Sequence, residues 1–258
     1  MIRFTVITCT FNAQSVVRRT LRSVLEQSYP HVEHLIIDGM SKDSTMSQVA
    51  DYERESAEKA ASHEIITVSE PDKGLYDAMN KGLRMATGDY LVYLNAGDVF
   101  PAKDTLENIA NAVGEGEELP GVLYGDTDVV DDEGHFVRHR RLSPPRELSW
   151  RSFRRGMLVC HQAFYARTDL AKAHPYDLQY RYSADVDWCI RIMKDAEARG
   201  LPLRNVHAVV VDFLDGGMTT AYHKASLKER FRVMRKHYGL LATLLAHAWF
   251  AVRAVFKK

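Results

Sequence analysis

The sequence predicts an α/β protein with a mostly parallel, Rossmann-like sheet flanked by helices. Over roughly the first hundred residues, four apolar strands alternate with three helices, a pattern typical of parallel strands joined by right-handed crossovers. Several of these strands end in acidic residues, and Tyr90–Asp98 is the clearest example. Because ligands bind at the carboxyl ends of strands in open α/β sheets, the same pattern also predicts a site.

Hydrophobic period and turn residues define the elements of the first half. An apolar run at 4–10 predicts the first strand, and apolar residues at helical spacing over 16–25 predict the first helix. Later strands are expected to end at Asp38, near Ser69 and at Asn95. Helices are expected over about 45–61, after the turn at 39–44, and over 75–86, before the turn at 87–89.

The regular alternation ends after Asp98. The later pattern predicts helices at 104–113 and 184–197, strands at 121–124, 158–166 and 205–214, an edge strand or ribbon at 135–142, and a helical extension over 224–258. At 258 residues the chain has the length of one α/β domain with an extension. We therefore expect a domain over 1–222 and a C-terminal helical segment over 223–258.

Composition narrows the class of protein. Lys plus Arg and Asp plus Glu both number 34, so the net charge does not favour a nucleic-acid partner. The three cysteines, Cys9, Cys160 and Cys189, are far apart and form no C-x-x-C pair, which argues against a disulfide framework or a structural zinc site. The N-terminus lacks the pattern of a secretory signal. We expect buried thiols and a cytoplasmic location.

The acidic strand ends have the chemistry of a metal and diphosphate site. The segment Asn95-Ala96-Gly97-Asp98 closes a buried strand with an amide, a turn glycine and a carboxylate. Oxygen ligands of this kind suit Mg²⁺ or Mn²⁺, which often use one or two carboxylates together with substrate phosphates and waters. The alternative for Asp98 is a helix-capping aspartate after a strand.

Five motifs in order resemble the GT-A fold glycosyltransferases of family 2, particularly the branch that includes colanic-acid-type and other surface-polysaccharide transferases. The matching segments are Thr8–Asn12, Leu35–Thr45, Ser69–Gly82, Leu94–Asp98 and Ser183–Trp188. The resemblance implies a donor half over 1–100 and an acceptor half over 101–222. It also implies a cofactor, Mn²⁺ or Mg²⁺, with Asp98 as its ligand, although Asn95 stands where the family's D-x-D motif has its first carboxylate.

The resemblance implies a set of residues that bind the donor nucleotide. They are Thr10, Asn12, Asp38, Asp72, Asn80 and Asn95. Asp38 would face the base, and an aspartate can accept hydrogens from uracil, thymine or guanine, so the chemistry does not choose among them; we place UDP ahead of GDP and dTDP. Asp38 and Asp72 have alternatives as turn or N-cap aspartates. Asn95 would contact the ribose or a metal-bound water.

The acceptor side is implied by two later segments. Asp185 aligns with the catalytic base of inverting members of the family, where it would take the proton of the acceptor hydroxyl. Asp187 is its competitor and an acceptor contact, although it lies about 200° around the same helix. His161 and Gln162 resemble an acceptor-side pair that approaches the donor sugar. The alternatives are helix-dipole partners for the two aspartates and a core position for His161.

Together these features predict an inverting, metal-dependent, hexosyltransferase-type enzyme that moves a single sugar to a saccharide acceptor, lipid-linked in surface-polysaccharide synthesis. A sugar nucleotidyltransferase would need a glycine-rich first loop, and Thr8–Ser15 has no glycine. A non-catalytic sugar-nucleotide-binding protein remains an alternative. The Q-x-x-R-W motif of processive synthases is absent, which favours single-sugar transfer.

The C-terminal segment predicts a peripheral membrane contact. Its apolar stretch, Leu240–Val252, has 13 residues, too few for a spanning helix of about 20. Basic residues bracket it, namely Arg235, Lys236, Arg253, Lys257 and Lys258. Such a helix can lie in the headgroup region of an anionic surface, here the cytoplasmic face of the inner membrane. The alternative is a helix packed on the protein or on a second copy in a homo-oligomer.

Overall fold

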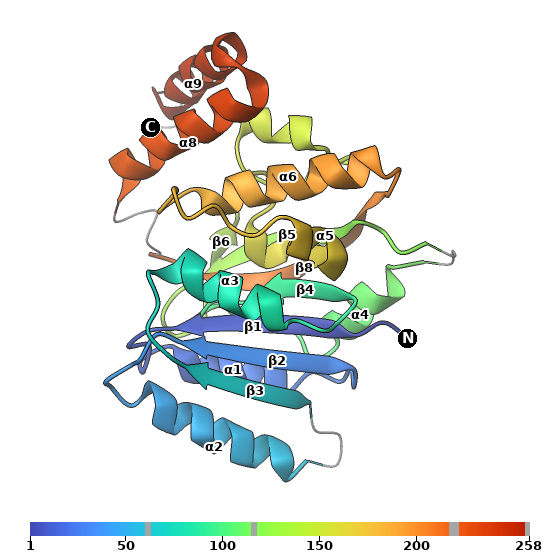
Figure 1. Cartoon of the computed structure of the whole chain (residues 1–258), viewed down its shortest axis with the longest axis vertical. Helices are drawn as coiled ribbons and strands as arrows, with labels where there is room; N and C mark the ends of the chain where they lie inside the picture. Colours follow the sequence, from blue (N-terminus) through green and yellow to red (C-terminus); the bar gives the residue numbers. More distant parts are fainter. Residues whose placement is uncertain (60–62, 115–117, 217–221, 256–258) are drawn as a thin grey trace.

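The computed structural model describes residues 1–59, 63–114, 118–216 and 222–255, and within them one mixed sheet forms the centre of the molecule (Figure 1). Its strands are β1 (Phe4–Thr10), β2 (Val32–Asp38), β3 (Glu64–Ser69), β4 (Tyr90–Tyr93), β5 (Val122–Val130), β6 (Phe136–His139), β7 (Phe164–Arg167) and β8 (Leu203–Leu214). The order is β3-β2-β1-β4-β7-β5-β6, with β8 paired to β5. Strands β1 to β4 are mutually parallel and β8 is parallel to β5, whereas β6 and β7 run antiparallel to their neighbours.

Helices cover both faces of this sheet. They are α1 (Val17–Leu25), α2 (Thr45–Ala57), α3 (Leu75–Met85), α4 (Thr105–Asn111), α5 (Thr168–Ala173), α6 (Ala184–Ala198), α8 (His223–Tyr238) and α9 (Leu240–Val255), with 3₁₀ turns η1 (Trp150–Arg155) and η2 (His161–Ala163). Ile36 packs with α1 and α2, whereas the next residue, Ile37, faces α3, because successive strand side chains alternate between faces. A Cβ on Gly82 would lie 2.5 Å from the Ile7 side chain, so α3 needs this glycine to approach the sheet.

The sheet register brings the ends of three strands into one row. Thr10 pairs with Asp38, and Asp38 pairs with Ser69, at the carboxyl ends of β1, β2 and β3. The predicted fold class, a mostly parallel α/β sheet flanked by helices with a helical C-terminus, is confirmed. The row places the predicted site at the edge to which these strands point, at the left in Figure 1.

Several predicted boundaries are wrong. The apolar run 158–166 is not one strand: polar His161 and Gln162 lie in η2, and only 164–167 pair in the sheet as β7. The helical pattern over 224–258 breaks at Gly239, whose φ of 80° ends α8 before α9 begins. Helix α2 ends at Ala57 and β4 at Tyr93, both earlier than expected. Helix α5 and the turn η1 were not predicted.

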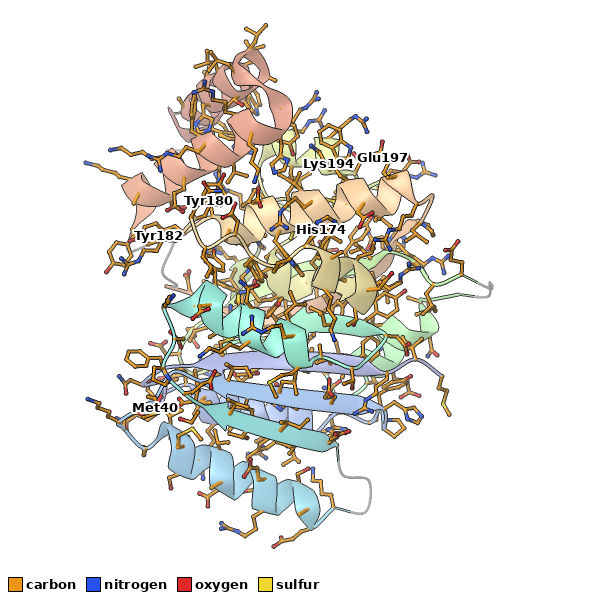
Figure 2. The ribbon with its side chains drawn as sticks, viewed as in Figure 1. Met40, His174, Tyr180, Tyr182, Lys194 and Glu197 are labelled. Atoms are coloured by element: carbon orange, nitrogen blue, oxygen red, sulfur yellow. The ribbon has the colours of Figure 1, made fainter. Side chains whose placement is uncertain are left out.

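Helix α8 contacts the start of α6 through hydrogen bonds and ion pairs. Glu229 accepts hydrogen bonds from the backbone N–H groups of residues 181–183. Asp187 on α6 contacts Lys236 at 3.0 Å and His237 at 2.8 Å, both from α8. Figure 2 shows Tyr180 and Tyr182 beside this junction. None of the described helices is long and apolar enough to span a bilayer.

Candidate active site

Asp38 is fully buried and organises the row of strand ends. Its carboxylate accepts hydrogen bonds from Thr10 Oγ1 at 3.0 Å, from Ser69 Oγ at 2.6 Å, and from both the backbone N–H and the hydroxyl of Ser41. Burial alone would raise the pKa of Asp38, but these donors bring it below its usual value. In this conformation Asp38 is therefore not available for the expected direct contact with a base. Thr10 is also buried, and its hydroxyl donates to the Asp38 carboxylate.

Exposed groups of the same edge surround Asp72. A Cβ on Gly39 would lie 2.5 Å from Asp72 Oδ2 and 3.3 Å from the Phe11 ring, so these three residues are in close proximity. Phe11 and Met40 are exposed, and Figure 2 shows Met40 at this edge. Exposed aromatic and apolar side chains beside a carboxylate form a surface on which a nucleobase can stack and donate hydrogen bonds. Asp72, and not Asp38, offers the accessible carboxylate here.

Asn12 holds the loop beside this surface. Its backbone is in the left-handed region, with φ of 48°, which asparagine tolerates. Its N–H donates to Ser41 Oγ at 2.8 Å, and its Oδ1 accepts the N–H of Lys42 at 2.9 Å. The side chain therefore fixes the 39–44 turn from the β1 side, and its amide N–H₂ makes no hydrogen bond with the described residues.

The segment Asn95–Asp98 follows β4 as a tight turn, closed by a hydrogen bond from the Asp98 N–H to the Asn95 carbonyl at 2.9 Å. Asp98 is buried, and its carboxylate accepts the Leu214 N–H at 2.9 Å and Gln162 Nε2 at 3.0 Å. Burial raises the pKa of Asp98 to about 6. Asn95 Oδ1 is buried and has no hydrogen-bond partner among the described residues.

These two groups fit a divalent cation. An unpartnered amide oxygen and a buried carboxylate lie within one four-residue turn, and a cation would satisfy the first and neutralise the second. Each carboxylate oxygen of Asp98 retains a lone pair beyond its one hydrogen bond. One carboxylate and one amide leave room for phosphates and water, the usual completion of a Mg²⁺ or Mn²⁺ shell.

The turn η2 links this segment to α6. His161 Nε2 lies 3.1 Å from Asn95 Nδ2, and His161 Nδ1 lies 3.4 Å from Asp185 Oδ2. Because a carboxylate only accepts, Nδ1 carries the proton toward Asp185, and in the neutral ring Nε2 accepts from Asn95. The neighbouring Gln162 donates to Asp98. Consecutive residues of one turn therefore contact the two carboxylates that the sequence singled out.

Asp185 lies at the N-terminus of α6 and accepts hydrogen bonds from Tyr76 Oη at 3.2 Å and from the N–H of Val186 at 2.9 Å. Burial would raise the pKa of Asp185, but the hydrogen bond and charge of His161, with the charge of Arg230, lower it below its usual value. The carboxylate is therefore ionised at neutral pH and can accept a proton from a bound hydroxyl.

Three predicted contacts belong to the scaffold instead. Asp187 is fully buried and paired with Arg191 at 2.6 Å and with α8, because it points away from Asp185 on the helix. Asn80 exchanges two hydrogen bonds with the backbone of Tyr176, at 2.9 and 2.8 Å, so its amide is not free for a nucleotide. Gln162 is buried and holds Asp98, so an acceptor sugar does not reach it in this conformation.

A second acidic cluster lies in the β5–β6 hairpin. Asp131, Glu133 and His135 have potential ligand atoms within 4.8 Å of one another. The Asp131 carboxylate already accepts the backbone N–H groups of Glu133 and His135, the pattern of a turn-forming aspartate. This exposed cluster is therefore explained by the hairpin turn.

Sequence reasoning missed Tyr76 and Arg230 as neighbours of Asp185. Tyr76 lay within a motif of the resemblance, which gave it no role. Arg230 lies on α8, in the segment that was expected to be a separate extension. Both could be found only from contacts between distant parts of the chain.

Comparison with known proteins identifies the relatives. The family described as Glycosyl transferase family 2 matches residues 5–172. A protein named PGL/p-HBAD biosynthesis glycosyltransferase from Mycobacterium tuberculosis is 30% identical over 248 residues, which cover 95% of this chain and 90% of the relative. Amylovoran biosynthesis glycosyltransferase AmsB of Erwinia amylovora is 28% identical over 227 residues, covering 81% and 70%.

Solved structures share the fold. TarS 1-349 of S. aureus in complex with UDP-GlcNAc has a TM-score of 0.71 at 18% identity, covering 91% of this chain; this chain spans 65% of that one. The mannosyltransferase PcManGT from Pyrobaculum calidifontis, in complex with GDP-Man and Mn²⁺, has a TM-score of 0.63 at 18% identity, covering 97% and 75%. At these identities the likeness establishes the GT-A-like fold.

Proposed function

This chain belongs to glycosyltransferase family 2, and from that premise we propose that it transfers a single sugar, with inversion, from a nucleotide diphosphate-sugar to a saccharide. The observation that supports this proposal is the pair formed by Asp98 and Asp185, which are both contacted by η2. Asp98 is buried in the same turn as the unpartnered amide oxygen of Asn95, and Asp185 is ionised. In such a pair one carboxylate, Asp98, can serve donor binding, and the other, Asp185, can accept the proton.

The proposed roles follow from these contacts. The nucleotide lies at the edge of Phe11, Met40 and Asp72, with Asn12 holding the adjoining loop. Asp185 takes the proton of the acceptor hydroxyl as the hydroxyl attacks the anomeric carbon on the side opposite the leaving diphosphate. His161 and Tyr76 orient Asp185. A divalent cation held by Asp98 and Asn95 would stabilise the charge of the departing nucleoside diphosphate.

The names of the relatives support a finer assignment. The mycobacterial and Erwinia relatives are named for PGL/p-HBAD and amylovoran biosynthesis. We accordingly place this chain in polysaccharide or glycolipid synthesis, within the colanic-acid-type branch, with a lipid-linked saccharide as acceptor. We keep UDP ahead of GDP and dTDP, and Mn²⁺ or Mg²⁺ as cofactor. Residues 1–100 would serve the donor and 101–222 the acceptor, with α8 completing the acceptor side.

A nucleotide screen tests the donor assignment. UDP with Mn²⁺ should raise the melting temperature more than GDP or dTDP at the same concentration, because a ligand that binds only the folded state stabilises it more when it binds more tightly. The matched UDP-sugar should then release UDP when acceptor is added. A larger shift with GDP would overturn the choice of base, and donor binding without transfer to any saccharide offered would favour a non-catalytic sugar-nucleotide-binding protein.

Helix α9 supplies a surface for the membrane part of the proposal. Three apolar side chains at helical spacing are exposed on its outward face: Leu241 is 73% exposed, Leu245 is 65% exposed and Trp249 is 57% exposed. Arg232 and Arg235 on α8 are also exposed, whereas Lys236 is engaged by Asp187 and Asp177. Lys257 and Lys258 lie outside the described residues. We propose that this face lies in the headgroup region of an anionic membrane, on the cytoplasmic side.

Serine at Leu241, Leu245 and Trp249 together should abolish most binding to vesicles containing phosphatidylglycerol. Each large apolar side chain contributes about 1.5 to 3 kcal/mol when buried, and these three make few contacts within the protein. Co-sedimentation measures the loss, and Phe136→Ser, an exposed apolar residue on β6, is the matched control. Unchanged vesicle binding by the triple variant would eliminate the membrane role, and a shift from dimer to monomer would assign the face to a second copy.

A further inference from the structure

The turn η2 contacts both residues of the proposed cation site with consecutive side chains. Gln162 Nε2 donates to Asp98 Oδ2 at 3.0 Å, and His161 Nε2 lies 3.1 Å from Asn95 Nδ2. A backbone hydrogen bond of 3.0 Å closes this turn. The turn is therefore ordered locally, and its two side chains can hold those of the 95–98 segment in place.

The hydrogen bonds of His161 have a direction that begins at Asp185. The distance from Asp185 Oδ2 to His161 Nδ1 is 3.4 Å, and a carboxylate can only accept. Nδ1 therefore carries the ring proton, and Nε2 of the neutral ring keeps a lone pair that accepts from the Asn95 amide nitrogen. The His161 ring is buried and lies edge-on to the buried Tyr93 ring, which limits its reorientation.

This direction determines which way the Asn95 amide points. Because Nδ2 donates to His161, Oδ1 is the atom that remains, and it is buried without a hydrogen-bond partner among the described residues. The reversed amide would bring its oxygen against the lone pair of His161 Nε2 and would leave the buried N–H groups without an acceptor, which is costly. Asn95 therefore presents an oxygen, and not a nitrogen, in the same turn as the Asp98 carboxylate.

We infer that His161 is a positioning residue of the cation site, where it holds the Asn95 amide so that its oxygen is free to be a ligand. This inference rests on the proposed function, and it explains how an asparagine can stand where the D-x-D motif has its first carboxylate. The two oxygens of a carboxylate are equivalent, whereas an amide can bind a cation only through its oxygen, so only the amide needs to be oriented. The same ring contacts the proposed base, so one side chain joins the donor site to Asp185.

Mn²⁺ binding to the full-length protein in the presence of UDP tests this role, with free Mn²⁺ measured by electron paramagnetic resonance. His161→Leu should weaken Mn²⁺ binding about tenfold, a usual loss when a residue that orients a metal ligand is removed. In the Asn95→Asp background, the same change should alter Mn²⁺ affinity by about twofold or less, because a carboxylate has no orientation to lose. His161→Gln should retain most of the affinity of the parent, because its amide can accept from Asn95 and donate to Asp185.

Four results would overturn the inference. Equal weakening by His161→Leu in both backgrounds would show that the ring only supports the turn. The other three are undiminished affinity in His161→Leu, a loss in His161→Gln as large as that in His161→Leu, and no binding of Mn²⁺ by the parent. These measurements follow cation binding and not sugar transfer. A protein that gives the expected affinities but transfers no sugar would therefore refute the proposed function alone.

The tautomer of His161 provides a second measurement, which does not depend on the folding of His161→Leu. Two-bond proton–nitrogen correlation spectra of the ligand-free protein, labelled with ¹⁵N-histidine, report which ring nitrogen carries the proton. The signal that is absent from the spectrum of His161→Gln belongs to His161. We expect the proton on Nδ1, and a proton on Nε2 would overturn the inference, because Nε2 could then no longer accept from Asn95.

Discussion

Asp185→Asn should reduce sugar transfer by about 10² to 10⁴, the usual value of a general base. Donor affinity should remain nearly unchanged, because the carboxylate contacts Tyr76 and His161 and lies outside the nucleotide surface. An amide cannot take the proton of the acceptor hydroxyl, although it keeps the size of the side chain. Rates under saturating donor and acceptor, with UDP affinity from calorimetry, measure the two effects. Full activity of the variant would exclude Asp185 as the base.

Asp187→Asn is the matched control, and it should act on stability. The Asp187 carboxylate is buried among Arg191, Lys236 and His237. Burial would raise its pKa, but His237 and Arg191 bring it well below the usual value. The ion pairs therefore stabilise the fold above the unfolded pKa of Asp187, near 4, and this stability is lost as pH falls below it. The free energy of unfolding of the variant should be about 3 to 5 kcal/mol lower than that of the parent at neutral pH. A loss of turnover with unchanged melting temperature would restore Asp187 as the base.

The sheet and its site edge could be predicted because they depend on local patterns. Strand ends follow from hydrophobic runs, and parallel pairing then brings Thr10, Asp38 and Ser69 into one row. The helix after Ser183 was predicted for the same reason. These features need only the residues within each element and the rule that joins parallel strands.

The partners of the polar side chains could not be predicted. Gln162 and Asp98 are 64 residues apart, Asn80 and Tyr176 are 96 apart, and Tyr76 and Asp185 are 109 apart. Sequence spacing carries no signal for such pairs. Asp38 illustrates the result: its position at the edge was right, but the hydroxyls of Thr10, Ser41 and Ser69 already use its carboxylate.

The raised pKa of Asp98 provides a test of whether this residue is a metal ligand or a structural aspartate. Burial raises its pKa from 3.8 to about 6, so above that pH the protein holds a buried negative charge. For an acid with a raised pKa, the contribution to folding stability is fully present below the unfolded value and is lost as pH rises through about 6. The ligand-free protein should therefore lose stability between about pH 4 and pH 6, and a bound cation should restore it.

Asp98→Asn should remove this pH dependence and reduce transfer by about 10² to 10³, the usual loss for one charge-stabilising contact. The asparagine can still accept the Leu214 N–H, so the fold should persist, and without the buried charge the ligand-free variant should be at least as stable as the parent at pH 7.5. Thermal shifts with UDP, with and without Mn²⁺, give the decisive measurement. In the parent, Mn²⁺ should enlarge the shift caused by UDP, whereas in the variant it should add nothing. Mn²⁺-dependent turnover that survives in Asp98→Asn would show that the cation is held elsewhere, with the hairpin cluster of Asp131, Glu133 and His135 as the next place to test.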